Sequence, residues 1–163
     1  MDDVRPYREN ISTFVSAIEN RLVKTILFDI DREPKFDLSS IPFHFLYTIQ
    51  IQLDTEDSTY RLFTSQTNIG LDTFWADKNT AGVDRTLEEL KVNSNVKVVS
   101  VGVDHGYVYK IHLQFNSQHL ILITGNINEN FDGSFTYKKQ DEIILAFKDI
   151  ESAEIFERLA ECR

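Results

Sequence analysis

The sequence predicts one α+β domain over residues 1–163, built on a single antiparallel sheet of six to eight strands in meander order. The N- and C-terminal helices are expected to pack on one face of that sheet. Two observations predict this class. Apolar residues alternate with polar ones in several central segments, as in strands, whereas they recur every three or four positions at both ends, as in helices. Strands that are neighbours in sequence usually pair, which favours the meander.

The first 30 residues are predicted to form the main helix. Pro6 suits a first helical turn. One apolar stripe follows at three- and four-residue steps, made by Ile11, Phe14, Val15, Ile18, Leu22, Thr25 and Ile26. Residues 31–42 contain Pro34 and Pro42, so we expect a linker there. This acidic segment is either a solvated connection or a negatively charged recognition loop.

The segment Phe43–Leu53 is predicted to be a long strand whose inward face carries Phe43, Phe45, Tyr47, Ile49, Ile51 and Leu53. A turn at 54–58 leads into Tyr60–Ser65, which predicts a hairpin. Ile69–Trp75 is expected to be a short strand, and Asp84 to cap a short helix through Leu90. Trp75 itself is interpreted either as a core residue or as a binding hot spot.

Residues 96–124 are predicted to form a three-stranded meander that organises the sheet. The connection 104–106 contains Gly106 and pairs Val103 with Tyr107, Val101 with Tyr109 and Val99 with Ile111. The two-residue turn Asn116–Ser117 pairs Phe115 with Gln118, Leu113 with Leu120 and Ile111 with Leu122. In this register the large apolar side chains of all three strands lie on a common face.

The C-terminal part is expected to contain a loop at 125–134 and a last hairpin. That hairpin joins Phe135–Tyr137 to Glu142–Phe147 around a turn at 138–141. Asp149 is then predicted to cap a final helix, Ile150–Glu161. Its inward face is expected to carry Ile150, Ala153, Phe156, Leu159 and Ala160.

The net charge of −9 disfavours whole classes of partner. Nucleic acids and anionic membranes bind through lysine and arginine, and this chain has 26 acidic against 17 basic residues. The first residues lack the apolar stretch of a signal peptide and no apolar run is long enough to cross a membrane, so a cytoplasmic location is expected. The single Cys162 excludes an internal disulfide and does not indicate a catalytic thiol.

Catalytic and cofactor-binding motifs are not found in the sequence. It has no glycine-rich phosphate loop, no zinc-ligand spacing, no nucleophile elbow and no EF-hand. We therefore expect no cofactor and no metal, and favour a non-enzymatic interpretation of the chain. In the predicted register His112 and His119 share a face. A metal or acid/base site there, with Asp104 or His105, would need a third ligand that the sequence does not identify.

The sequence is compatible with two functions from different classes. The first is a non-catalytic, acidic protein-binding module, such as an inhibitor that neutralises a basic bacterial toxin, for example a nuclease. In architecture and charge the chain is similar to small acidic immunity proteins. The expected contacts are Asp29, Asp31, Glu33, Asp37, Asp54, Glu56, Asp57 and Trp75. The alternative is a small-molecule-binding or weakly enzymatic cavity protein of α+β cone type, with its ligand site at Tyr47, Tyr107, Tyr109 and His112. A self-associating structural domain is a third hypothesis.

Overall fold

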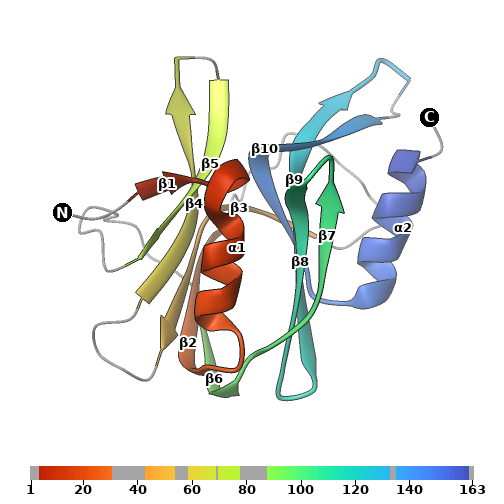
Figure 1. The fold of residues 1–163 in the computed structure, drawn as a ribbon. Coiled ribbons are helices and arrows are strands. Elements are labelled where there is room, and N and C mark those ends of the chain that lie inside the picture. Colours follow the sequence, from red (N-terminus) through yellow and green to blue (C-terminus); the bar gives the residue numbers. More distant parts are fainter. Residues whose placement is uncertain are drawn as a thin grey trace.

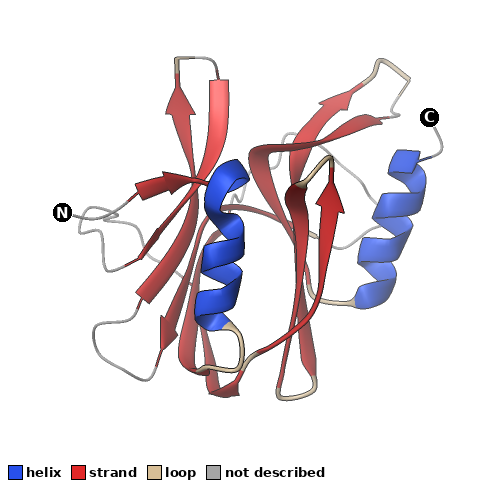
Figure 2. Cartoon of the chain, viewed as in Figure 1, coloured by secondary structure: helices blue, strands red, loops and turns tan. Residues whose placement is uncertain are grey.

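The computed structural model describes residues 4–30, 43–53, 59–68, 70–77, 88–132 and 135–161. Within these ranges lie two helices and ten strands (Figures 1 and 2). In chain order they are β1 Val4–Pro6, α1 Tyr7–Ile18, β2 Leu22–Ile30, β3 His44–Leu53, β4 Thr59–Thr67, β5 Gly70–Asp77, β6 Glu88–Asn95, β7 Lys97–Asp104, β8 Tyr107–Phe115, β9 Gln118–Glu129, β10 Phe135–Phe147 and α2 Ile150–Glu161. Neither helix is long and apolar enough to cross a membrane.

The strands form one antiparallel sheet in the order β1-β5-β4-β3-β10-β9-β8-β7, and β2 joins β3 to β6. Strand β3 is the branch point. Its first residues pair with β10, its later residues pair with β4, and β2 pairs with it through most of its length. The sheet curls into a half-barrel with α1 in its concavity (Figure 1). The predicted antiparallel sheet is therefore confirmed, but the strand count is higher and the meander is only partial.

Hydrophobic residues gather in two separate clusters. The concave cluster surrounds α1 and contains Tyr7, Ile11, Phe14, Val15, Ile18, Val23, Ile26, Phe28, Leu46, Ile49, Ile51, Leu53, Leu62, Trp75, Val92, Val96, Ile111, Leu113, Phe115, Leu120, Leu122, Ile144 and Ala146. The α2 cluster contains Phe45, Ile121, Ile123, Ile127, Phe135, Leu145, Phe147, Ala153 and Phe156. Each helix thus packs in a cluster of its own, and the prediction that both helices share one face is not supported.

The predicted N-terminal helix is too long. The apolar stripe from Ile11 to Ile18 is buried as a helix face, but Asn20 takes a left-handed φ of 59° and residues 22–30 form β2. The later part is rich in β-branched residues, which favour strands. A register shift between Val23 and Thr25 then lets Thr25 and its neighbour Ile26 both be buried. This local irregularity is what made the strand resemble a helix stripe.

The alternation predicted for β3 breaks at Tyr47. The pairing with β2 shifts between Asp29 and Ile30, so that Tyr47 is left out of the register. On one side of the shift Phe45 packs in the α2 cluster, and on the other side Ile49 packs in the concave cluster. Tyr47 is 42 % exposed, so its expected place on the inward face is wrong. The hairpin from β3 to β4 is confirmed.

Strands β7, β8 and β9 form the predicted meander. The register between β8 and β9 is the predicted one, whereas the register between β7 and β8 is not. All three predicted pairs across the β8–β9 turn are confirmed. The β7–β8 pairs differ from the predicted ones. Val103 lies opposite Val108 and Val101 lies opposite Ile111, because each of the two strands contains a register shift. The shift at Gly102 leaves Tyr109 out of the ladder. Tyr109 consequently packs against the α2 cluster while Ile111 lies in the concave cluster, so their predicted common face is wrong.

Strands β6 and β10 differ from the prediction, whereas helix α2 matches it. Residues 88–95 form strand β6 instead of a helix end, and Asp84 lies outside the described residues. The expected last hairpin is one strand, β10, that pairs with β9 around a register shift between Lys138 and Ile143. Helix α2 has the predicted bounds, and the Asp149 carboxylate accepts the Ser152 backbone N–H at 2.7 Å as its cap. Its Ala153 and Phe156 are buried, whereas Ile150 and Leu159 are exposed.

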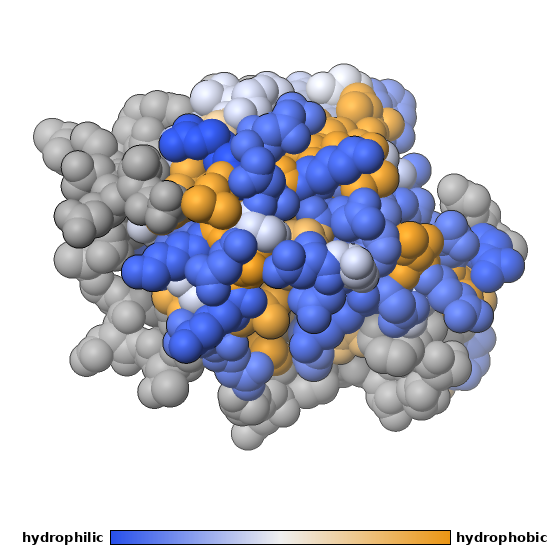
Figure 3. All heavy atoms as spheres, turned by 90° about the horizontal axis from the view of Figure 1, so that it is seen from below, coloured by the Kyte–Doolittle hydropathy of each residue, from blue (hydrophilic) through white to orange (hydrophobic). Residues whose placement is uncertain are grey.

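The end of the molecule away from the β7–β8 turn is shown in Figure 3. Its described residues are mostly hydrophilic, and hydrophobic side chains appear there in separate patches. A hollow lies at the opposite end, where the β7–β8 turn approaches the start of α1 (Figure 1).

Candidate functional site

A hollow of about 200 Å³ lies where three distant segments meet. The first turn of α1, the β7–β8 turn and the irregular part of β10 contribute its walls. The lining residues are Tyr7, Asp104, His105, Tyr107, Val108, Tyr109, Lys139 and Gln140. We call this site the tyrosine hollow, because three phenol rings line it together with one carboxylate and one ammonium group.

Two local backbone features build the tyrosine hollow. At the β7–β8 turn, His105 and Gly106 both have positive φ values of 49° and 83°, as the tightest hairpin turns require. Glycine takes that conformation without steric cost, and so the turn can remain two residues long. In β10, the register shift between Lys138 and Ile143 removes residues 139–142 from the pairing. It is this displaced stretch that supplies Lys139 and Gln140 to the lining.

The carboxylate and the ammonium group of the tyrosine hollow each contact a neighbouring ring. The Asp104 carboxylate lies 3.0 Å from His105 Nδ1. That hydrogen bond, helped by the nearby charges of His105 and Lys139, holds the pKa of Asp104 below its ordinary value, so the carboxylate is ionised at neutral pH. The Lys139 ammonium lies 4.6 Å from the centre of the Tyr109 ring, a cation–π contact.

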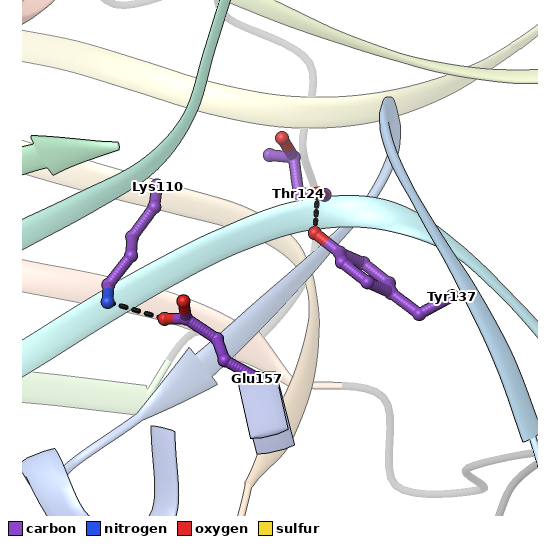
Figure 4. A network of polar contacts seen from close by, with 4 residues as sticks. All are labelled: Lys110, Thr124, Tyr137 and Glu157. Atoms are coloured by element: carbon purple, nitrogen blue, oxygen red, sulfur yellow. Dashed lines mark hydrogen bonds and ion pairs between the residues drawn. The ribbon is translucent and has the colours of Figure 1, made fainter. Parts of the chain in front are cut away.

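A partly buried tyrosine, Tyr137, packs against the α2 cluster as Tyr109 does. The Tyr137 hydroxyl donates a hydrogen bond of 2.7 Å to the Thr124 backbone carbonyl (Figure 4). Its ring lies against Gly125, where an added Cβ would be 2.0 Å from the Tyr137 Cε2 atom. Burial, and then the proximity of Tyr109, raises the pKa of Tyr137 strongly. Tyr137 therefore stays neutral and acts as a structural donor.

An ion pair ties β8 to α2 beside this tyrosine. The Lys110 ammonium contacts the Glu157 carboxylate of α2, and both side chains are largely buried (Figure 4). Lys110 follows Tyr109 in β8, so this contact fixes the strand where the tyrosine leaves the ladder.

The predicted histidine pair is confirmed as a contact. His112 Nε2 lies 2.9 Å from His119 Nδ1, in the register that the sequence predicted. One nitrogen must donate and the other accept, so at least one ring is neutral. Burial, His119 and Lys110 together lower the pKa of His112. No group of three metal-ligating side chains occurs among the described residues, and Asp104 and His105 lie at the other end of the strand.

The predicted partner contacts are not gathered at one place that the structure describes. Asp29 is partly exposed on β2, whereas Asp31, Glu33, Asp37, Asp54, Glu56 and Asp57 lie outside the described residues. Trp75 is 1 % exposed, and its ring centre lies 6.1 Å from that of Phe14. The core interpretation of Trp75 therefore holds, and its use as a surface hot spot is wrong because a partner cannot reach it.

The predicted ligand site is only partly assembled. Tyr107 and Tyr109 both line the tyrosine hollow, but Tyr47 and His112 do not. Sequence reasoning missed Tyr7, Lys139 and Gln140 as site residues. The sequence carries only an indirect signal for them, because the polar residues 138–141 fit a turn and Tyr7 fits the start of a helix.

Comparisons with known proteins found no matching family model, no similar curated protein and no similar solved structure.

Proposed function

We propose that this protein is a non-catalytic protein-binding module that takes a basic side chain of its partner into the tyrosine hollow. The observation that carries the proposal is the combination, in one hollow of about 200 Å³, of an ionised carboxylate with three phenol rings. Ligand pockets for drug-sized molecules are larger, roughly 300–1,000 Å³. A hollow of this size suits one side chain better than a whole cofactor.

The contact between Lys139 and Tyr109 supports the choice of a cation. Aromatic faces attract ammonium and guanidinium groups, and the Tyr109 ring already has an ammonium at 4.6 Å. An arginine from a partner, in place of Lys139, would stack on the ring and pair with the Asp104 carboxylate. Arginine suits this geometry because its planar group can stack and form two hydrogen bonds at once.

The net charge supports a basic partner over an acidic one. A charge of −9 attracts a cationic protein over a distance and repels an anionic one. An inhibitor or immunity protein that neutralises a basic bacterial toxin, such as a nuclease, is the concrete form of the proposal. Asp29, on β2, and the acidic residues of 31–37 and 54–57 stay proposed as further contacts of the same partner.

The proposal is tested by capture of partners with matched variants. Immobilised wild-type protein and its Asp104→Asn and Tyr107→Ala variants are exposed to a lysate of the native host, and bound proteins are quantified by mass spectrometry. A basic protein should bind the wild type and the control variant Glu154→Gln, which removes one exposed carboxylate from α2. Its binding to Asp104→Asn should fall about tenfold, the usual cost of losing a charged hydrogen bond. Equal binding to Asp104→Asn and wild type would refute the hollow as the contact.

Binding of a small molecule is the second candidate, and the presence of both Tyr107 and Tyr109 in the hollow favours it. Native mass spectrometry of the freshly purified protein distinguishes the candidates. A mass increment that the Tyr107→Ala variant lacks would support a small ligand. A bare chain mass together with capture of a basic protein supports the partner proposal.

A further inference from the structure

The described part of the sheet has three free edges that differ in their protection. Strand β1 has three residues and ends at Pro6, which has no N–H to offer a neighbour. Strand β6 exposes Glu88, Glu89 and Lys91, and such charges discourage pairing. Strand β7 instead exposes Val99, Val101 and Val103, to 42 %, 37 % and 58 %. Among these edges β7 is therefore the one suited to receive another strand.

We propose that β7 pairs with β7 of a second copy of this chain, which joins the two sheets in a symmetric dimer. The two strands would run antiparallel and overlap over their full length, from Lys97 to Asp104. Such an arrangement satisfies the outward backbone N–H and C=O groups of both edges. The inference does not depend on the proposed function, but both use the Asp104 carboxylate, so the variants of Val101 are the ones that separate the two.

Symmetric pairing sets a strict condition on which residues face each side of the sheet. Residues directly opposite each other point to the same face. A two-fold axis between antiparallel strands keeps the faces of the sheet unchanged. Full-length overlap therefore requires the first and last residues of β7 to lie on one face. A regular strand of eight residues fails this condition, because side chains alternate and its ends fall on opposite faces.

The register shift in β7 lets the strand meet this condition. Val98 lies opposite Leu113 and Val101 opposite Ile111, both residues of the concave cluster, although three positions separate the two valines. The extra residue is Val99, which is left out of the pairing with β8. Lys97 and Asp104 consequently share the face opposite to that of Val98 and Val103.

The resulting contacts are complementary at the axis and toward both ends of the strand. Val101 lies on the two-fold axis and meets Val101 of the other copy, and each Val98 meets Val103. On the other face, Lys97 of each copy lies opposite Asp104 of its neighbour. The dimer thus covers two of the exposed valines with apolar groups and pairs the charges at both ends. This charge complementarity is what identifies a second copy, among all extended segments, as the occupant.

The proposal is tested by the mass in solution. Analytical ultracentrifugation of the full chain should give a dimer, at twice the 18.9 kDa of one chain. Val101→Lys places two like charges at the axis and should give a monomer. The control Leu159→Lys makes the same change at an exposed apolar position of α2, 43 % exposed, and should remain a dimer. A wild-type monomer at all concentrations, or a dimeric Val101→Lys variant, overturns the proposal.

Two further variants test the register and protect against misfolding. Lys97→Glu should give a monomer, and adding Asp104→Lys to it should restore the dimer, since the opposite charges then meet again. In a Cys162→Ser background, Val101→Cys should form an inter-chain disulfide under mild oxidation, whereas Leu159→Cys should not. A double charge variant that stays monomeric refutes the register. Because Val101 does not line the tyrosine hollow, its variants leave the partner proposal untouched.

Discussion

Replacement of Phe156 by alanine tests the division of the core into two clusters. Phe156 is fully buried and is the central ring of the α2 cluster. Its ring centre lies 5.8 Å from Phe135 in a stacked arrangement, 5.1 Å from Tyr137 edge-on and 5.4 Å from Phe147. Removing a buried phenylalanine costs about 3–5 kcal/mol, because the transfer free energy is lost and a cavity remains.

The expected loss is a large part of the total stability. Single domains unfold with about 5–15 kcal/mol, so Phe156→Ala should lower the urea midpoint strongly while the variant still folds. The control Leu159→Ala, on the exposed side of the same helix, should change the free energy of unfolding by less than about 0.5 kcal/mol. Urea titration followed by far-UV circular dichroism measures both, because this signal reports on the whole fold, whereas the single Trp75 lies in the concave cluster. A loss below about 1 kcal/mol for Phe156→Ala would refute the packing of α2 described above.

A double substitution makes the test specific to two clusters. Phe14 is fully buried in the concave cluster, and Phe156 belongs to the other cluster. If the clusters are independent, the destabilisation of Phe14→Leu and Phe156→Leu should add within about 0.5 kcal/mol. A larger coupling free energy would show that one continuous core joins the two helices.

Three other predictions follow from the same structure. Gly125→Ala should lower the free energy of unfolding by about 1–3 kcal/mol, because the new Cβ would meet both the Tyr137 ring and the Lys138 carbonyl oxygen, 2.6 Å away; thermal unfolding measures this, and an unchanged melting temperature would contradict it. Tyr137→Phe should cost about 1 kcal/mol through the lost hydrogen bond to Thr124, with an unaltered circular dichroism spectrum. The folded-state pKa of His112 is below the unfolded value of 6.5, so the unfolded chain binds more protons and stability should fall as the pH drops below 6.5. His112→Asn should reduce the change in the free energy of unfolding with pH below 6.5. Some pH dependence should remain, because the pKa of His44 is lowered too.

Local signals were sufficient wherever a strand or helix was regular. The Asn116–Ser117 turn has two residues with positive φ, 47° and 62°, and it fixed the β8–β9 register that the sequence predicted. Helix α2 was predicted with its bounds, because the Asp149 cap and the apolar spacing agree. In both cases the residues that decide the structure are neighbours in sequence.

Non-local contacts explain what could not be predicted. The tyrosine hollow joins Tyr7, the turn at 104–109 and residues 139–140, which lie far apart in the chain. No sequence pattern indicates that the first turn of α1 approaches β10, since the contact depends on how the sheet curls. Strand β2 pairs with β6, and β3 pairs with β10. These pairings also join segments far apart in the chain, and they too depend on how the sheet curls.

Register shifts caused the main errors of alternation and also create both proposed surfaces. If β8 were regular, Tyr109 would share the face of Ile111 and lie in the concave cluster, away from Lys139. If β7 were regular, Lys97 and Asp104 would lie on opposite faces, and a full-length symmetric pairing would be impossible. An extra residue in a strand has a weak sequence signature, yet it redirects every side chain beyond it. The positions where periodicity fails in β7 and β8 are therefore the positions to mutate first in a search for function.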